Sequence, residues 1–281
     1  VLVVPPIPGG NGEVDPAVLV ICRLLGITQV FRINGPAGIA ALGFGTESIP
    51  KVRKVVGPGS PAVTLAQVEM QRHGLATMML LGPTESLVVA DHTAHVGKLA
   101  SDLLIEAEHG TDSSVVFVCT SEDIIDAVEN ELQIQIGDLP ANRAEACRAS
   151  LGDNGGAILV TSLAEAIEVA NVYAPEHCQV AVSAQDEEKV VDGIINAGEI
   201  LIGQHTPFSA GNFVIGVPAS LPTSGFAHVS SGITVNAFLK HTAIAKANET
   251  ALRRMAPTVL ALSDHEGFPA HGNAIRRRFP E

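Results

Sequence analysis

The segment around which this chain is organised runs Leu103-Leu-Ile-Glu-Ala-Glu-His-Gly-Thr-Asp112. Apolar residues recur through it and before it at three- and four-residue spacing, which predicts a helix that ends at Gly110. Glu106 and His109 are three positions apart, so both project from one face of the last helical turn. A carboxylate and an imidazole that converge at a helix end can bind a divalent metal. The alternative is a surface glutamate beside a hydrogen-bonded structural histidine.

Length and composition favour a two-domain α/β protein. The 281 residues can build a sizeable core, and 46% of them are apolar whereas only 4% are aromatic. A core of aliphatic side chains suits parallel sheets that are covered by helices. The net charge of −13 argues against a nucleic-acid partner, because phosphates are bound by a basic surface.

Hydropathy and cysteine usage favour a cytoplasmic protein. No apolar run is long enough to span a bilayer and no signal peptide is recognisable, so we expect no membrane partner. Cys22, Cys119, Cys147 and Cys178 are isolated in apolar surroundings, which predicts buried thiols in a reducing compartment. The chain opens inside an expected strand at residues 1–4, so we expect that an N-terminal portion of a longer protein is missing.

Strands and helices alternate along most of the chain. Apolar runs predict strands at residues 1–4, 28–33, 52–56, 86–90, 114–119, 157–160, 179–182 and 200–202. Strand–helix–strand alternation implies parallel sheets with right-handed crossovers. We therefore predict an α/β fold with two Rossmann-like parallel-sheet units in sequence and a small helical C-terminal segment. The expected domains are residues 1–81, 82–237 and 238–281.

A glycine-rich turn lies in the first unit. Gly57-x-Gly59-x-x-Ala62 matches a dinucleotide phosphate loop in outline, but prolines interrupt it and no acidic residue is well placed about twenty positions later. The alternative is a tight turn that leads into a helix at residues 63–70.

Three further polar segments interrupt apolar elements. Glu176-His177 lies between an expected helix and an expected strand, Asn212 lies in a segment rich in small residues, and Glu266 precedes His271. Each alone is more typical of a structural role. Together with Glu106 and His109, they favour one site that is assembled from distant segments.

Several motifs occur in this chain in the order in which one known family carries them. They are Ala41-Leu-Gly-Phe-Gly-Thr-Glu-Ser-Ile-Pro-Lys51, Val56-Gly-Pro-Gly59, Gly82-Pro-Thr-Glu85 with Leu87-Val-Val-Ala-Asp91, Ser101-Asp-Leu-Leu104, Glu108-His-Gly110 with Asp112-Ser113, Ala174-Pro-Glu-His177, Leu221-Pro-Thr-Ser-Gly225 and Ala270-His271. In this set the chain resembles the histidinol dehydrogenase family over essentially its whole length. The family's N-terminal segment, roughly a third of the protein, has no counterpart here.

The resemblance implies a zinc- and NAD-dependent homodimer that oxidises a small amino alcohol to the aldehyde and then to the acid, with reduction of two NAD. It implies that His177 is the general base and that Glu176 activates water for the second oxidation. It places the zinc ligands, one ion per site, at Glu106, His109, Asn212 and His271, and substrate contacts at Thr84 and Glu266. His271 and Glu266 would reach in from the partner subunit through the C-terminal segment. NAD contacts would fall at Ala37 and Ser60 in the first, cofactor-side domain, and residues 82–237 would form the catalytic domain.

The chain departs from the family pattern at several of these positions. Glu106 replaces Gln, Asn212 replaces Asp, Thr84 replaces Ser, Ala37 replaces Gln and Ser60 replaces Asn; Pro218-Ala219 replaces Asn-His, and Phe208 replaces a substrate-contacting Glu. The leading hypothesis is zinc- and NAD-dependent oxidation of an alcohol through the aldehyde to the acid, as in the oxidation of L-histidinol to L-histidine in histidine biosynthesis. The alternatives are a family member acting on a different small alcohol, a catalytically decayed homologue that serves as a binding or dimerisation partner, and an incomplete fragment.

Overall fold

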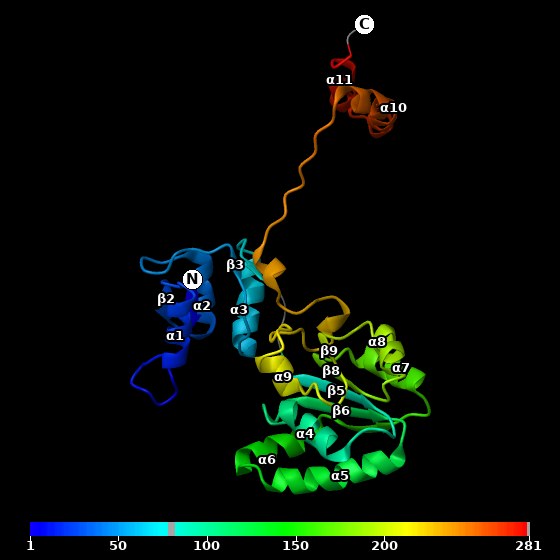
Figure 1. The fold of residues 1–281 in the computed structure, drawn as a ribbon. Coiled ribbons are helices and arrows are strands. Elements are labelled where there is room, and N and C mark those ends of the chain that lie inside the picture. Colours follow the sequence, from blue (N-terminus) through cyan, green and yellow to red (C-terminus); the bar gives the residue numbers. More distant parts are fainter. Residues whose placement is uncertain (78–81, 280–281) are drawn as a thin grey trace. The chain divides into compact units, whose positions relative to one another are not determined.

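The computed structural model describes residues 1–77 and 82–279 (Figure 1). The chain divides into two compact units, Val1–Phe238 and Leu239–Glu281. Among the described residues, no helix combines the length and the apolar character that a membrane crossing requires. The separation of residues 1–81 from 82–237 as independent domains stays a prediction.

A five-stranded parallel sheet forms the centre of the first unit. Its strands are β5 (Glu85–Ala90), β6 (Ser114–Cys119), β7 (Gly156–Leu159), β8 (His177–Ala181) and β9 (Glu199–Ile202). Their order is β7-β6-β5-β8-β9, and every neighbouring pair is parallel. The chain thus starts in the middle strand, adds two strands on one side and then adds two on the other, which is a doubly wound arrangement.

Helices cover both faces of this sheet (Figure 1). They are α4 (Val96–Ala107), α5 (Glu122–Gly137), α6 (Ala141–Arg148), α7 (Leu163–Tyr173), α8 (Glu187–Gly193) and α9 (Phe208–Phe213), with a π-helical turn at Ala149–Asp153. Alternate residues of β5 face opposite ways: Val88 packs in a cluster with α4 and α5, and Leu87 packs in a cluster with α7 and α8. The sheet is therefore buried on both faces, as its near-continuous aliphatic strands predict.

Residues 1–77 form two separate strand pairs and three helices. β1 (Leu2–Val4) pairs with β2 (Val30–Arg32), and β3 (Lys54–Val55) pairs with β4 (Ala76–Thr77), both in parallel. The helices are α1 (Pro16–Leu24), α2 (Gly35–Phe44) and α3 (Pro61–Gln71). The expected single parallel sheet is not seen here. The strand expected at 52–56 is only two residues long, because it ends before Gly57-Pro58. A strand of two residues is too short to join the two strand pairs into one sheet.

The burial of the first strand differs from expectation. Val1 is 51% exposed, and of the first four residues only Val4 is fully buried, so the prediction of a buried strand at residues 1–4 is wrong for most of its length. The prediction for the cysteines is confirmed: all four are buried, unpaired thiols. Burial raises the pKa of Cys178 to about 12, so this thiol next to His177 stays protonated.

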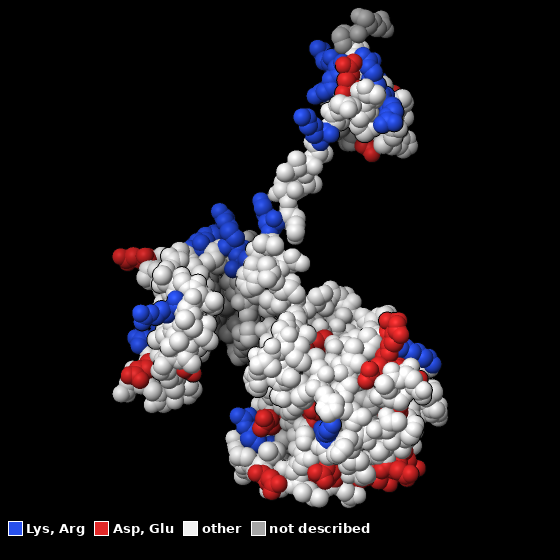
Figure 2. All heavy atoms as spheres, in the orientation of Figure 1, with Lys and Arg blue, Asp and Glu red and all other residues white. Residues whose placement is uncertain are grey.

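The second unit contains two helices, α10 (Glu249–Glu266) and α11 (Pro269–Arg276). Asn248 caps α10 by accepting a hydrogen bond from the Ala251 amide, and Gly267 ends it in a left-handed conformation with φ of 72°. The terminal arginines 276–278 are exposed, and Lys and Arg side chains gather on this unit (Figure 2). These arginines form a solvated basic surface at the end of α11.

Candidate active site at the amino edge of the central sheet

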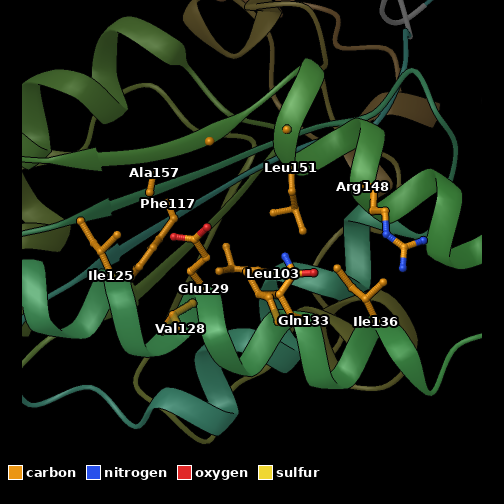
Figure 3. A pocket seen from close by; sticks show the side chains of 13 residues that line it. Leu103, Phe117, Ile125, Val128, Glu129, Gln133, Ile136, Arg148, Leu151 and Ala157 are labelled. Atoms are coloured by element: carbon orange, nitrogen blue, oxygen red, sulfur yellow. The ribbon is translucent and has the colours of Figure 1, made fainter.

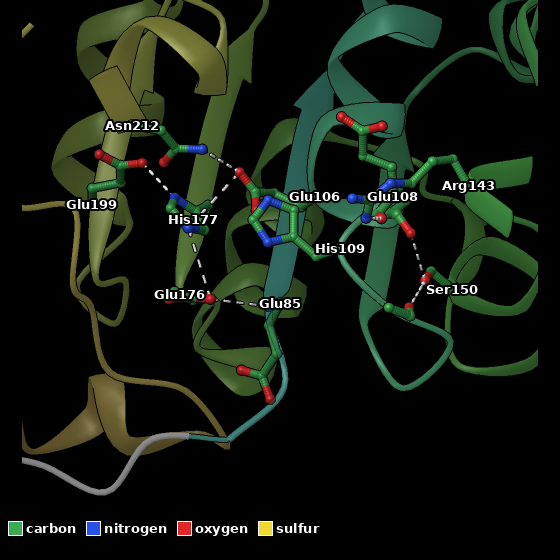
Figure 4. A network of polar contacts seen from close by, with 12 residues as sticks. Glu85, Glu106, Glu108, His109, Arg143, Ser150, Glu176, His177, Glu199 and Asn212 are labelled. Carbon is green, nitrogen blue, oxygen red and sulfur yellow. Dashed lines mark hydrogen bonds and ion pairs between the residues drawn. The ribbon is translucent and has the colours of Figure 1, made fainter. Parts of the chain in front are cut away.

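Three neighbouring strands of the central sheet begin with an ionisable residue. Glu85 opens β5, His177 opens β8 and Glu199 opens β9. Strand register places His177 between Ser86 and Glu199. Because the strands are parallel, their amino ends share one edge of the sheet, and the C-terminal turn of α4 brings Glu106 to that same edge (Figure 4).

Glu106 is the buried centre of this group. It is 0% exposed, and the Asn212 side-chain amide donates a hydrogen bond to its Oε1 over 2.8 Å. His109 Nε2 lies 3.4 Å from Oε2, although the His109 side chain itself is half-exposed. Oε2 is buried and accepts no hydrogen bond. A buried carboxylate oxygen without a donor is costly unless a proton or a cation joins it.

His177 lies among three carboxylates of the same edge. Its Nδ1 lies 2.5 Å from Glu199 Oε1, and its Nε2 lies 3.7 Å from Glu176 Oε2 and 3.9 Å from Glu106 Oε1. Burial disfavours the charged ring, but the Glu199 hydrogen bond and the surrounding carboxylates outweigh it, so the pKa of His177 is raised. Phe208 of α9 lies edge-on to the ring, with 5.7 Å between ring centroids.

Glu176 is positioned by the sharp end of α7. Ala174 adopts a left-handed conformation with φ of 52°, which stops the helix two residues before Glu176. The Glu176 carboxylate then accepts a hydrogen bond from the Glu85 amide over 3.2 Å. Burial raises the pKa of Glu176 to about 7, opposed by His177 and the Glu85 amide and aided by Glu106 and Glu85. A carboxyl group of that pKa can accept or release a proton near neutral pH.

The segment 221–225 closes over the start of β5. The Ser224 amide donates to Glu85 Oε1 over 2.9 Å, and Thr223 Oγ1 accepts from the Gly82 amide over 2.5 Å. Burial raises the pKa of Glu85, against the hydrogen bonds from the Ser224 and Gly225 amides. Thr84 is half-buried here, and its carbonyl accepts from the Ser114 amide. This family motif therefore lies at the same edge as Glu176 and His177.

The structure brings together five of the residues that the sequence proposed: Glu106, His109, Glu176, His177 and Asn212 (Figure 4). Thr84 directly precedes β5 at the same edge, and the remaining four lie elsewhere on the chain. Ala37 is exposed on α2, Ser60 is exposed directly before α3, and Glu266 and His271 are exposed in the second unit. Their roles toward cofactor, substrate and metal stay predictions.

The distance between Glu106 and His109 suits two ligands of one metal ion. Among residues 1–77 and 82–279, no set of three or more His, Cys, Asp or Glu side chains is placed to hold a metal. However, two ligands of a tetrahedral zinc ion lie about 3.4 Å apart. That is the separation between Glu106 Oε2 and His109 Nε2. Asn212 presents its NH₂ group to Glu106, so its oxygen becomes available only if the amide rotates.

Glu85 and Glu199 were not among the residues that the sequence proposed. Their signal is a single acidic residue directly before an aliphatic strand, at Glu85-Ser86-Leu87 and Glu199-Ile200-Leu201. An acidic residue directly before an aliphatic strand is ordinarily assigned to the preceding loop. Here both side chains turn into the polar edge and make the hydrogen bonds described above.

A cavity of about 330 Å³ lies away from this edge (Figure 3). It is lined mainly by apolar side chains of α5, β6 and the π-helical turn, with Glu129, Gln133 and Arg148 among them. None of the proposed site residues lines it, so it is not part of the candidate active site.

Comparisons with known proteins identify one family to which this chain is similar. A family model described as histidinol dehydrogenase matches residues 1–279. The histidinol dehydrogenase of a Synechocystis strain is 40% identical over 272 residues, covering 96% of this chain and 62% of the relative. That of Methanosarcina mazei is 38% identical over 273 residues, covering 97% and 61%.

A solved structure shows the same fold. The crystal structure of histidinol dehydrogenase from Elizabethkingia anophelis superposes with a TM-score of 0.91 at 31% identity, covering 98% of this chain and 69% of that one. The chain therefore spans about three fifths of the length of the curated relatives that it matches.

Proposed function

This chain belongs to the histidinol dehydrogenase family, and on that premise we propose that it oxidises L-histidinol through the aldehyde to L-histidine, with NAD⁺ as the hydride acceptor. The observation that carries the proposal is the buried Glu176–His177 pair beside Glu106 and His109. These residues place two proton-transfer groups next to an orphaned carboxylate oxygen. Two successive oxidations at one carbon need these groups: one base for the hydroxyl proton, one base for the water proton and a group that can bind the metal.

In the first oxidation His177 acts as the base. With Nδ1 held by Glu199, its Nε2 is the nitrogen that faces the site. Nε2 takes the hydroxyl proton while the carbinol carbon loses a hydride, so one alcohol and one NAD⁺ give one aldehyde, one NADH and one proton. Burial of the ring excludes water that would compete for this proton.

In the second oxidation Glu176 takes a proton from water. Burial raises its pKa to about 7, so it can accept a proton near neutral pH. The water oxygen bonds to the aldehyde carbon, and loss of a second hydride gives the carboxylate, a second NADH and two protons. The Glu85 amide holds the Glu176 carboxylate in place for this step.

A zinc ion would be held by Glu106 Oε2 and His109 Nε2, with Asn212 and the His271 of a second copy completing the set. When bound, zinc polarises the substrate oxygen and NAD⁺ receives the hydrides. Support for zinc comes from the orphaned Glu106 oxygen and its spacing to His109. A homodimer follows from this set, because His271 and Glu266 would come from the partner. NAD contacts at Ala37 and Ser60, and a substrate contact at Thr84, belong to the same proposal.

A second candidate substrate is a smaller or less polar alcohol. Phe208 is fully buried and lies against His177, which presents an apolar wall beside the base. Pro218-Ala219 offers no imidazole or amide to a polar substrate ring. These two features favour a substrate with fewer polar groups than histidinol.

The test is to measure NADH formation by the full chain with L-histidinol and with simple amino alcohols, for wild type, Glu176→Gln and His177→Asn. We expect Glu176→Gln to stop at the aldehyde with one NADH per alcohol, and His177→Asn to lose at least about 10²-fold in rate. Glu188→Gln is a matched control, because Glu188 is exposed on α8. If His177→Asn keeps the wild-type rate, the proposed base is wrong. Absence of NADH from every alcohol would favour a decayed homologue.

A further inference from the structure

We propose that Glu199 is a positioning residue that fixes which ring nitrogen of His177 acts as the base. The proposal rests on the function proposed above, because it assumes that His177 takes the substrate proton. It adds a third buried group behind the Glu176–His177 pair and assigns that group a single task.

The backbone places Glu199 directly beside His177. The two residues are register partners in the β8–β9 ladder, and the Glu199 amide donates to the Glu176 carbonyl over 3.1 Å. Both are the first residues of their strands, so the position of one side chain relative to the other is set by the sheet. This fixed backbone brings Glu199 Oε1 to 2.5 Å from His177 Nδ1.

Both side chains are shielded from solvent. The exposed fractions are 3% for the Glu199 side chain and 5% for the His177 side chain. A hydrogen bond to an ionised carboxylate is short and strong, and water does not compete for it here. This contact therefore holds the imidazole more firmly than the longer contacts at Nε2 do.

The contact decides the tautomer. A carboxylate only accepts hydrogen bonds, so Nδ1 must carry the hydrogen, and the lone pair of the neutral ring is then on Nε2. Nε2 is the nitrogen that faces Glu176, at 3.7 Å, and Glu106, at 3.9 Å. When Nε2 takes a proton, the negative charge of Glu199 stabilises the imidazolium that forms. In serine proteases the catalytic aspartate likewise fixes the tautomer of the catalytic histidine and stabilises its imidazolium form.

Helix α9 packs closely over this contact at a glycine. A Cβ at Gly211 would lie 3.3 Å from both Glu199 oxygens and 3.0 Å from Leu201 Cδ1. Phe208, from the same helix, lies edge-on to the His177 ring. The helix thus covers the carboxylate with one residue and supports the imidazole with another, which leaves the ring little freedom to turn over.

The experiment compares wild type with Glu199→Ala and Glu199→Gln in the full chain, with Glu188→Gln as the control. The first readout is the low-field proton NMR signal of the His177 Nδ1–H, identified by its absence in His177→Asn. It does not depend on activity. We expect the signal in wild type and Glu188→Gln and its loss in Glu199→Ala.

The second readout is the split between kcat and KM for the alcohol that is turned over fastest. We expect kcat to fall by about 10²- to 10⁴-fold in both Glu199 variants while KM changes by less than about threefold, and Glu199→Asp to recover part of the loss. Glu199→Gln keeps the side-chain volume, so it remains informative if Glu199→Ala does not fold.

The outcomes separate the two proposals. If the low-field signal persists in Glu199→Ala, or if kcat stays within about threefold of wild type in Glu199→Gln, the positioning role is overturned while the proposed function stands. If wild type shows the signal but oxidises no alcohol, the proposed function is overturned and the tautomer assignment is supported.

Discussion

Replacing Asn212 with Asp changes the charge at the point where Asn212 meets Glu106. In the wild type the amide donates to Glu106 Oε1 over 2.8 Å, in a group that also holds His109 and His177. Aspartate has nearly the same shape but no donor. Without a metal ion, two carboxylate oxygens would then face each other, whereas with a zinc ion both could serve as ligands. The substitution should therefore have effects of opposite sign in the two conditions.

The cost without metal follows from this distance. Two unit charges 2.8 Å apart repel by about 6 kcal/mol at an effective dielectric constant of about 20. Protonating one carboxyl group at pH 7, from an ordinary pKa of about 4, costs about 4 kcal/mol and is the easier route. We therefore expect Asn212→Asp to lose up to about 4 kcal/mol of unfolding free energy, or about 8–16 °C in Tm for a unit of this size.

The assay is thermal unfolding at pH 7, once with a chelator and once with excess zinc. In zinc, the variant should recover most of the loss, because it supplies an anionic ligand in place of a neutral amide. Asn236→Asp makes the same charge change at an exposed residue and controls for net charge. A chelated variant within about 2 °C of wild type would refute the contact with Glu106. An equal zinc shift for wild type and variant would refute the place of Asn212 at the metal.

Two further predictions concern packing and pH. Phe208→Ala removes a fully buried ring that supports His177, and we expect a loss of about 3–5 kcal/mol by urea unfolding; a loss below about 1 kcal/mol would contradict its burial. Burial acts to raise the pKa of Asp91, but hydrogen bonds from Thr93 and the Ser183 amide outweigh it and lower the pKa. A lowered folded pKa gives stability that is present above about pH 4 and is lost as the pH falls through the folded pKa, so acid unfolding of Asp91→Asn should depend less on pH. Identical acid limbs for the two proteins would contradict this.

The strands of the central sheet lie close to where the sequence predicted them, and the errors at the starts of three of them have one cause. The strands expected at 86–90, 179–182 and 200–202 begin instead at Glu85, His177 and Glu199. Each prediction started after an ionisable residue, because charged side chains are rarely buried in strands. His177 and Glu199 are buried because they hydrogen-bond each other, and Glu85 is half-buried because its carboxylate accepts from the Ser224 amide. The residues at which the predicted and observed strand starts differ are therefore residues of the candidate active site.

Local and distant contacts differ in how far a single sequence can predict them. The approach of His109 to Glu106 follows from three-residue spacing on one helix. The contact of Glu199 with His177 depends on the register of two strands that lie 22 residues apart, and periodicity does not fix that register. The separate strand pairs of residues 1–77 were missed for a similar reason, since apolar runs show that strands exist but do not show which ones pair.

The central claim is that the amino edge of the sheet carries out two oxidations at one carbon. The most direct measurement is the number of NADH molecules formed per L-histidinol consumed by the full chain, with L-histidine measured in the same sample. We predict two NADH and one L-histidine for each histidinol. Consumption of histidinol with one NADH and accumulation of aldehyde by the wild type would contradict the role assigned to Glu176, and no NADH at all would contradict the proposed substrate.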